Sequence, residues 1–76
     1  MTYCVFAGME YYPSAGLDEY NDFKGLFDTR YDAVKAVNDW AEKEQNVGYD
    51  LCWWQICDHE TMTLIEKGDG TCLPSL

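Results

Sequence analysis

Four cysteines and a single histidine are the residues of this chain best suited to metal or redox chemistry. Cys52, Cys57 and His59 fall close together, and Cys72 follows near the C-terminal end. Zinc prefers thiolate and imidazole ligands, but its cysteine pairs usually have a shorter spacing than that from Cys52 to Cys57. On a regular strand, two residues that are five positions apart point to opposite faces of the sheet. We therefore expect reduced, buried thiols and no bound cofactor, with a small metal or redox protein as a weaker alternative.

Residues for acid–base or nucleophilic catalysis are sparse. His59 falls at an expected turn, where a histidine is usually solvated. Ser14 follows a proline and Ser75 lies near the end of the chain, so neither fits a nucleophile elbow. The chain has no phosphate-binding glycine motif. The sequence thus predicts that the protein is not an enzyme.

The stretch GMEYYPSAGLDEYND, residues 8–22, holds three tyrosines and four carboxylates but no basic residue. It lacks the ligand spacing of an EF-hand loop. Tyrosine is enriched at interfaces because it joins a large apolar ring to a polar tip. The sequence predicts a partner-binding surface made of this stretch and an acidic hairpin: Glu10, Tyr11, Tyr12, Asp18, Glu19, Tyr20, Asp22, Asp58 and Glu60. Whether Tyr11 and Tyr12 belong to this surface or to the core stays open.

The elements that must position these residues follow from hydrophobic periodicity. Ala33, Val34, Val37, Trp40 and Ala41 recur at helical spacing, and Asp28 or Thr29 can cap the resulting helix. Apolar or alternating runs predict four strands, with Gly25 as a bulge or close-approach point in the second. The predicted strands are residues 2–9, 22–28, 49–58 and 61–67, and the helix spans 29–48.

One helix with one apolar stripe can cover one face of such a sheet. We expect an α+β fold of two layers, a four-stranded and mostly antiparallel sheet with one helix, in the order β-β-α-β-β. Residues 1–67 form the single domain, and residues 68–76 form a loose tail after a tight His59–Glu60 turn.

Charge is the strongest global signal, because 14 acidic residues against 5 basic ones give a net charge of −9. Such a surface repels nucleic acid and attracts basic partners. Hydrophobic residues make up 47% of the chain, which is typical of a folded domain. The N-terminus resembles no signal peptide and no membrane span, so we expect an intracellular protein without membrane contact.

Three stretches together resemble small acidic hypothetical proteins of bacteriophages and prophages. They are VFAGMEYYPSAG, DFKGLFD and a tryptophan-containing strand that precedes a hairpin, and the resemblance covers residues 3–66. As a class, small acidic phage proteins include anti-CRISPR and anti-restriction inhibitors, several of which mimic DNA. The class resemblance implies an inhibitor in the host cytoplasm.

The leading hypothesis is therefore a phage-encoded inhibitor that evades host defence. It would bind a basic nucleic-acid-binding surface of a defence complex, such as a CRISPR effector, without binding nucleic acid itself. The alternative is a non-inhibitory interaction module that binds a host enzyme through its aromatic loop or a sheet edge.

Overall fold

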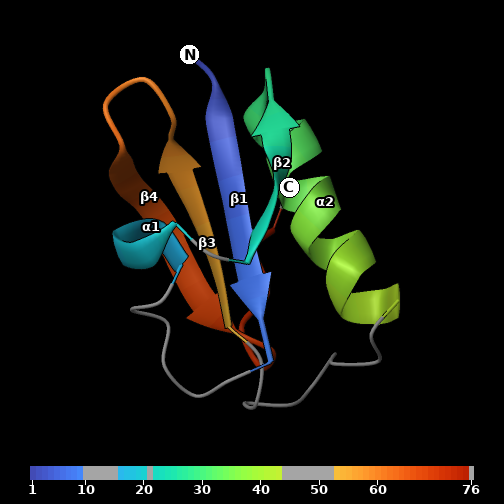
Figure 1. Ribbon diagram of the computed structural model, residues 1–76. Helices are drawn as coiled ribbons and strands as arrows, with labels where there is room; N and C mark the ends of the chain where they lie inside the picture. The colour runs from blue at the N-terminus through green and yellow to red at the C-terminus, as the bar shows by residue number, and fades with distance from the viewer. Residues whose placement is uncertain (10–15, 21, 44–52, 76) are drawn as a thin grey trace.

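The structure, a computed structural model, describes residues 1–9, 16–20, 22–43 and 53–75 (Figure 1). A four-stranded antiparallel sheet in the order β2-β1-β3-β4 forms its centre. None of the described helices is long and apolar enough to cross a membrane. The elements are β1 (Tyr3–Gly8), α1 (Gly16–Glu19), β2 (Phe23–Phe27), α2 (Arg30–Lys43), β3 (Trp53–Asp58) and β4 (Thr63–Asp69).

The two central strands, β1 and β3, are buried on both faces, as their apolar sequences predict. They pair without a break from Tyr3 opposite Asp58 to Gly8 opposite Trp53. Every residue from Cys4 to Ala7 is fully buried. The centre of the sheet therefore presents apolar side chains to both sides, and each side needs a cover.

Helix α2 covers one face of the sheet (Figure 1). Its start confirms the predicted cap, because the Thr29 hydroxyl accepts a hydrogen bond from the Asp32 backbone amide at 3.1 Å. The stripe of small and branched residues on α2 packs against alternate residues of β1 and β3. This core contains Val5, Ala7, Ala33, Val34, Val37, Trp54 and Ile56. The predicted part of the helix from residue 44 to 48 lies outside the described residues.

The α+β class and the antiparallel sheet are confirmed, but the predicted order of elements is not matched, because α1 stands between β1 and β2. This helix has four residues, too few to show a helical period in the sequence. It lies on the face opposite α2, where the Leu17 amide donates to Gln55 Oε1 at 2.8 Å. A Cβ on Gly16 would lie 2.8 Å from the Trp53 ring, so glycine permits this close approach.

Strand β2 contains the bulge that Gly25 predicts. Val5 pairs with Gly25 and Phe6 pairs with Phe23, which leaves Lys24 as the extra residue. Gly25 has a φ of 149°, a backbone angle that other residues rarely adopt. Regular alternation along this strand would place Phe23 and Phe27 on one face. The bulge instead puts Phe23 beside Phe6 and Phe27 on the α2 side.

The hairpin between β3 and β4 is longer than the predicted two-residue turn. Asp58 pairs with Thr63, so four residues form the turn and β4 begins two residues later than expected. The Asp58 carboxylate accepts a hydrogen bond from the Glu60 amide at 2.9 Å. Met62 adopts a φ of 54°. A local carboxylate–backbone bond thus determines a turn that the sequence pattern alone did not reveal.

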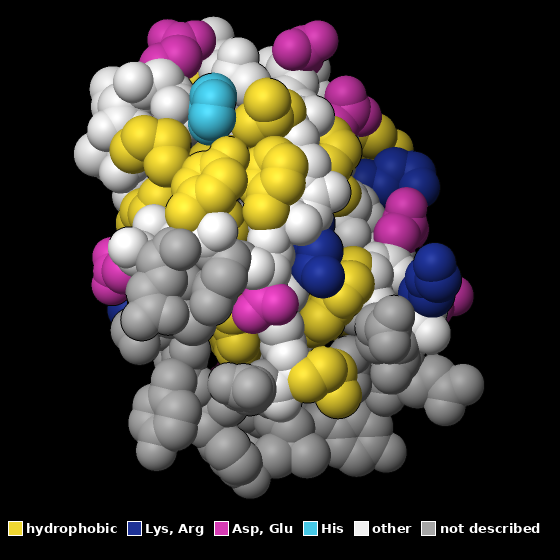
Figure 2. All heavy atoms as spheres, viewed as in Figure 1, with side chains coloured by type: hydrophobic (Ala, Val, Ile, Leu, Met, Phe, Trp, Pro, Cys, Tyr) yellow, Lys and Arg dark blue, Asp and Glu magenta, His cyan; other side chains and the backbone are white. Residues whose placement is uncertain are grey.

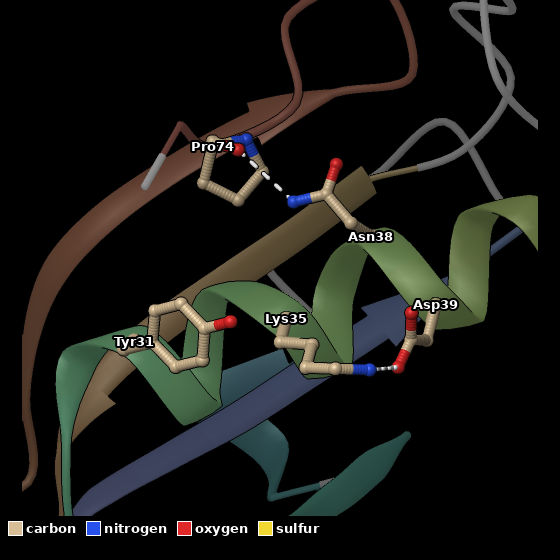
Figure 3. Close-up of a pocket in the computed structure, with 5 residues that line it drawn as sticks. All are labelled: Tyr31, Lys35, Asn38, Asp39 and Pro74. Carbon is tan, nitrogen blue, oxygen red and sulfur yellow. Dashed lines mark hydrogen bonds and ion pairs between the residues drawn. The ribbon is translucent and has the colours of Figure 1, made fainter.

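The C-terminal segment differs from the expected loose tail, because β4 continues to Asp69 and the residues after it pack on the domain. Trp54 Nε1 donates to the carbonyl oxygens of Asp69 and Cys72 at 3.2 and 3.1 Å. Leu73 packs against the α2-side core, and Asn38 Nδ2 donates to the Pro74 carbonyl at 3.0 Å (Figure 3). These contacts join the segment to both the sheet and α2.

Gly68 is expected to tolerate no side chain where this segment turns back. A Cβ there would lie 2.7 Å from the Cys72 carbonyl oxygen and 2.8 Å from the Trp54 ring. We expect Gly68→Ala to lower the free energy of unfolding by about 1–3 kcal/mol, the usual cost of overpacking. Urea denaturation measures it, with the exposed neighbour Lys67→Ala as the control. Equal stabilities of the two variants would contradict the packing described here.

Candidate protein-interaction surface

The face of the sheet opposite α2 is only partly covered. Its buried residues are Cys4, Phe6, Trp53 and Cys57, and Leu17 of α1 packs against them. Because α1 has only four residues, it covers the Trp53 and Gln55 end of this face. We call this side of the sheet the open face.

A row of apolar side chains crosses the open face at the Cys4 level. Leu26, Cys4, Cys57 and Leu64 are successive register partners on the four strands, so their side chains share one face. The two cysteines are fully buried, whereas Leu26 is 49% exposed and Leu64 is 42% exposed. The edge strands therefore present aliphatic side chains to the outside on a face where α1 is the only helix among the described residues.

Aromatic side chains continue this surface toward α1. Tyr20 and Phe23 stack with ring centroids 5.6 Å apart, and both meet Phe6 edge-on at 5.4 and 5.8 Å. Phe6 is fully buried beneath them, while Tyr20 and Phe23 keep 49% and 41% of their surface exposed. Tyr20 has a φ of 50°, which is rare for a bulky residue and is held here by its ring contacts.

We define the open-face strip as Tyr20, Phe23, Leu26 and Leu64. Figure 2 shows hydrophobic side chains gathered on this face, with acidic side chains around them. Large apolar side chains that cluster on a surface, as opposed to lying scattered, are typical of interaction sites.

The acidic residues of the predicted surface lie at both ends of the sheet. Asp22 accepts a hydrogen bond from the Ala7 amide through its carbonyl at 3.1 Å, at the far end of β1. Asp58 pairs with Tyr3, at the beginning of β1. Ala7 is four residue steps along β1 from Tyr3, which corresponds to about 13 Å of strand. Asp18, Asp22 and Glu60 are exposed, so carboxylates border the strip at both ends.

Four of the five basic residues belong to α2 or contact it. Arg30 holds Glu66 through two hydrogen bonds of 2.7 and 2.8 Å, and Lys35 binds Asp39 at 2.6 Å. Lys24 places its ammonium 5.8 Å from the centre of the Trp40 ring. Lys43 also belongs to α2. The pairing with Gln55 places Lys67 on the open face.

The bonds to Glu66 and Asp69 predict a specific dependence of stability on pH. Hydrogen bonding to Arg30 lowers the pKa of Glu66, and hydrogen bonding to Thr71 lowers the pKa of Asp69. For a carboxylate with a lowered pKa, the stabilisation is complete above the unfolded pKa and is lost as the pH falls through the folded pKa. Melting temperature should therefore fall as pH drops below about 4.5.

The same bonds define the variant that checks this prediction. Glu66→Gln should melt a few degrees lower at neutral pH and lose less on acidification, since the substituted side chain no longer titrates. Thermal melts between pH 7 and pH 2 measure this effect, with the exposed Glu42→Gln as the matched control. Parallel pH curves for Glu66→Gln and the wild type would show that the pair does not contribute.

The cysteines give no support to a metal centre in the described part of the chain, where no three His, Cys, Asp or Glu side chains are placed to share an ion. Burial raises the pKa of Cys4, and burial together with the neighbouring Cys4 raises the pKa of Cys57 to about 12. Thiols of this kind are poor nucleophiles and poor metal ligands at neutral pH. Cys4, Cys57 and Cys72 are free, and Cys52 lies outside the described residues.

A pocket beside α2 is another candidate site among the described residues. Tyr31, Lys35, Asn38, Asp39 and Pro74 line it (Figure 3). Lys35 bonds Asp39, and Asn38 bonds the Val34 and Pro74 carbonyls. Its charged and amide groups are thus used within the fold, which leaves the open face as the better candidate site.

Comparison with known proteins places the chain among phage proteins. The family model described as Bacteriophage T4 protein Y07C matches residues 3–68. The chain belongs to this family. The predicted relationship to phage hypothetical proteins is thereby confirmed, whereas the match carries no information on an anti-CRISPR role. No curated protein and no solved structure matches the chain.

The structure brings only part of the predicted surface together. Asp18, Tyr20 and Asp22 lie at the α1 end of the open face, and Glu60 lies in the hairpin at the opposite end, whereas Asp58 pairs with Tyr3 on the α2 side of the sheet. Glu10, Tyr11 and Tyr12 lie outside the described residues, as does the side chain of Glu19.

Sequence reasoning missed Phe23, Leu26 and Leu64 as surface candidates. One signal could have found them. The two central strands are apolar on both faces, and one amphipathic helix can cover only one face of a sheet. His59 also differs from the solvated turn residue that was expected, since its Nδ1 is buried without a hydrogen-bond partner.

Proposed function

We propose that this member of a phage protein family is an inhibitor that binds a basic, nucleic-acid-binding surface of a host defence complex. The observation that carries the proposal is the set of exposed carboxylates at the two ends of the open face. Exposed carboxylates border the open face at both ends, while four of the five basic residues lie on or against α2. A basic groove built for phosphates would attract the open face and meet little opposing charge.

Electrostatics of this kind supports binding to a protein that binds nucleic acid and opposes binding to nucleic acid itself. The net charge of −9 repels a phosphate backbone. Carboxylates in the short segments at the ends of a small sheet can instead occupy sites where phosphates bind. Inhibition then follows from occupation of the groove, with no catalytic step by this chain.

Capture by purified defence complexes tests the proposal. The tagged protein is presented to a panel that includes CRISPR effectors and restriction enzymes at about 50 mM salt. We expect one complex to be retained, and we expect its affinity to decline steeply as salt increases. A labelled DNA duplex serves as the control and should not bind the protein. Retention of no complex at low salt would refute the proposal.

A non-inhibitory interaction module is the second candidate, and the open-face strip is the observation that favours it. Apolar contacts alone would give an affinity that changes little with salt. A salt-insensitive complex that leaves the partner's nucleic-acid binding intact would therefore favour this second function. A salt-sensitive complex that releases nucleic acid favours the inhibitor.

A further inference from the structure

We propose that the open-face strip is the docking surface of this protein, and that its occupant is a protein segment with an apolar centre and basic ends. The strip is formed by Tyr20, Phe23, Leu26 and Leu64, each between 41% and 49% exposed. The inference that the strip contacts a host partner rests on the proposed function, but the chemistry of the strip can be tested separately.

The structure supports the apolar centre of this occupant. Leu26 and Leu64 lie at the two ends of one cross-strand row, and the stacked rings of Tyr20 and Phe23 lie beside it. The residues beneath, Cys4, Cys57 and Phe6, are fully buried and hydrogen-bonded in the two central strands. A partner would therefore meet half-exposed apolar side chains held on a rigid base, which is the arrangement of interface hot spots.

The structure also supports the basic ends. Asp18 and Asp22 lie at one end of the strip, and the exposed Glu60 lies beyond its other end, in the hairpin after β3. Lys67 is a basic residue that the register places on this face. A partner that carries lysine or arginine on both sides of an apolar centre would pair its charges with these carboxylates.

The same charges argue against a second copy of this chain as the occupant. Two open faces brought together would oppose acidic borders, and each copy carries a net charge of −9. Like charges at an interface cost affinity and slow the encounter. The charge distribution therefore disfavours self-association through the strip.

A designed peptide can test this chemistry without knowledge of the host partner. The probe has three central apolar residues, leucine, phenylalanine and leucine, with two lysines at each end. Two control peptides change one property each, with serines in the centre or glutamates at the ends. Isotope-labelled protein is titrated with each peptide, and amide chemical shifts locate the contact.

We expect the apolar, lysine-flanked peptide to perturb amides around Leu26 and Leu64, with at least tenfold weaker binding of either control. Leu26→Ser should weaken binding about tenfold, whereas Tyr31→Ser, an equally exposed apolar site on α2, should leave it within about twofold. Thermal melts ensure that both variants are folded.

Several results would overturn the assignment of the docking surface. These are shifts centred on α2, equal binding of the serine-centred peptide, or no perturbation at about 1 mM peptide. Sedimentation that reveals a dimer abolished by Leu26→Ser would assign the strip to a second copy instead. Failure of the proposed function is distinguishable from these, because it appears in the capture of defence complexes and not in the peptide titration.

Discussion

Replacing Trp54 by alanine is expected to lower the free energy of unfolding by about 3–5 kcal/mol, the usual cost of truncating a buried tryptophan. Trp54 is 3% exposed and packs in the core between the sheet and α2. Its Nε1 also joins the sheet to the C-terminal segment through Asp69 and Cys72. A 76-residue domain has a total stability of only about 4–11 kcal/mol, so this variant should be close to unfolded.

A second variant separates the two roles of the indole. Trp54→Phe keeps most of the apolar contact but leaves the Asp69 and Cys72 carbonyls without this donor, which should cost about 1–3 kcal/mol. Urea unfolding followed by circular dichroism measures both variants. If both Trp54→Phe and Trp54→Ala unfold like the wild type, the packing of the C-terminal segment against the sheet is wrong.

Reversing the charge of Asp18 is expected to weaken binding to a captured defence complex by about tenfold or more at low salt. Asp18 is exposed on α1, at the end of the open face that also carries Asp22. Asp18→Lys replaces a carboxylate that attracts the basic groove with a charge that the groove repels. The association rate should account for much of the loss, since charge steers the encounter.

Two matched variants show whether position or only net charge matters. Glu60→Lys changes the other end of the open face, and Glu42→Lys changes an exposed site on α2. All three reversals alter net charge by the same amount. We expect Glu60→Lys to weaken binding and Glu42→Lys to change it by less than about twofold. Equal losses for all three, measured by surface plasmon resonance at two salt concentrations, would mean that the acids act only through net charge.

The parts of the fold that the sequence predicts well are those with a strong apolar period. Val34, Val37 and Ala41 define the buried stripe of α2, and Thr29 caps it as expected. The buried central strands follow in the same way from runs that are apolar on both faces. Each of these features depends on contacts that repeat along the chain, which a single sequence displays directly.

The features that the sequence did not predict depend on single local interactions. The Lys24 bulge puts Phe23 and Phe27 on opposite faces of the sheet. A hydrogen bond from Leu17 to Gln55 places the four-residue helix α1 on the open face. Neither the bulge nor this hydrogen bond produces a periodic pattern of apolar residues in the sequence. For this reason the acids and Tyr20 of the candidate site were predicted, while Phe23, Leu26 and Leu64 of the open-face strip were missed.

Competition for nucleic acid on a captured defence complex is the most direct test of the proposed inhibition. The complex is held with a labelled DNA or guide–target substrate at about 50 mM salt, and this protein is titrated in. We predict full release of the nucleic acid, with a midpoint that increases in proportion to substrate concentration, as expected for two ligands of one groove. Retention of the nucleic acid at saturating protein would contradict the proposed inhibition and leave only a non-inhibitory interaction.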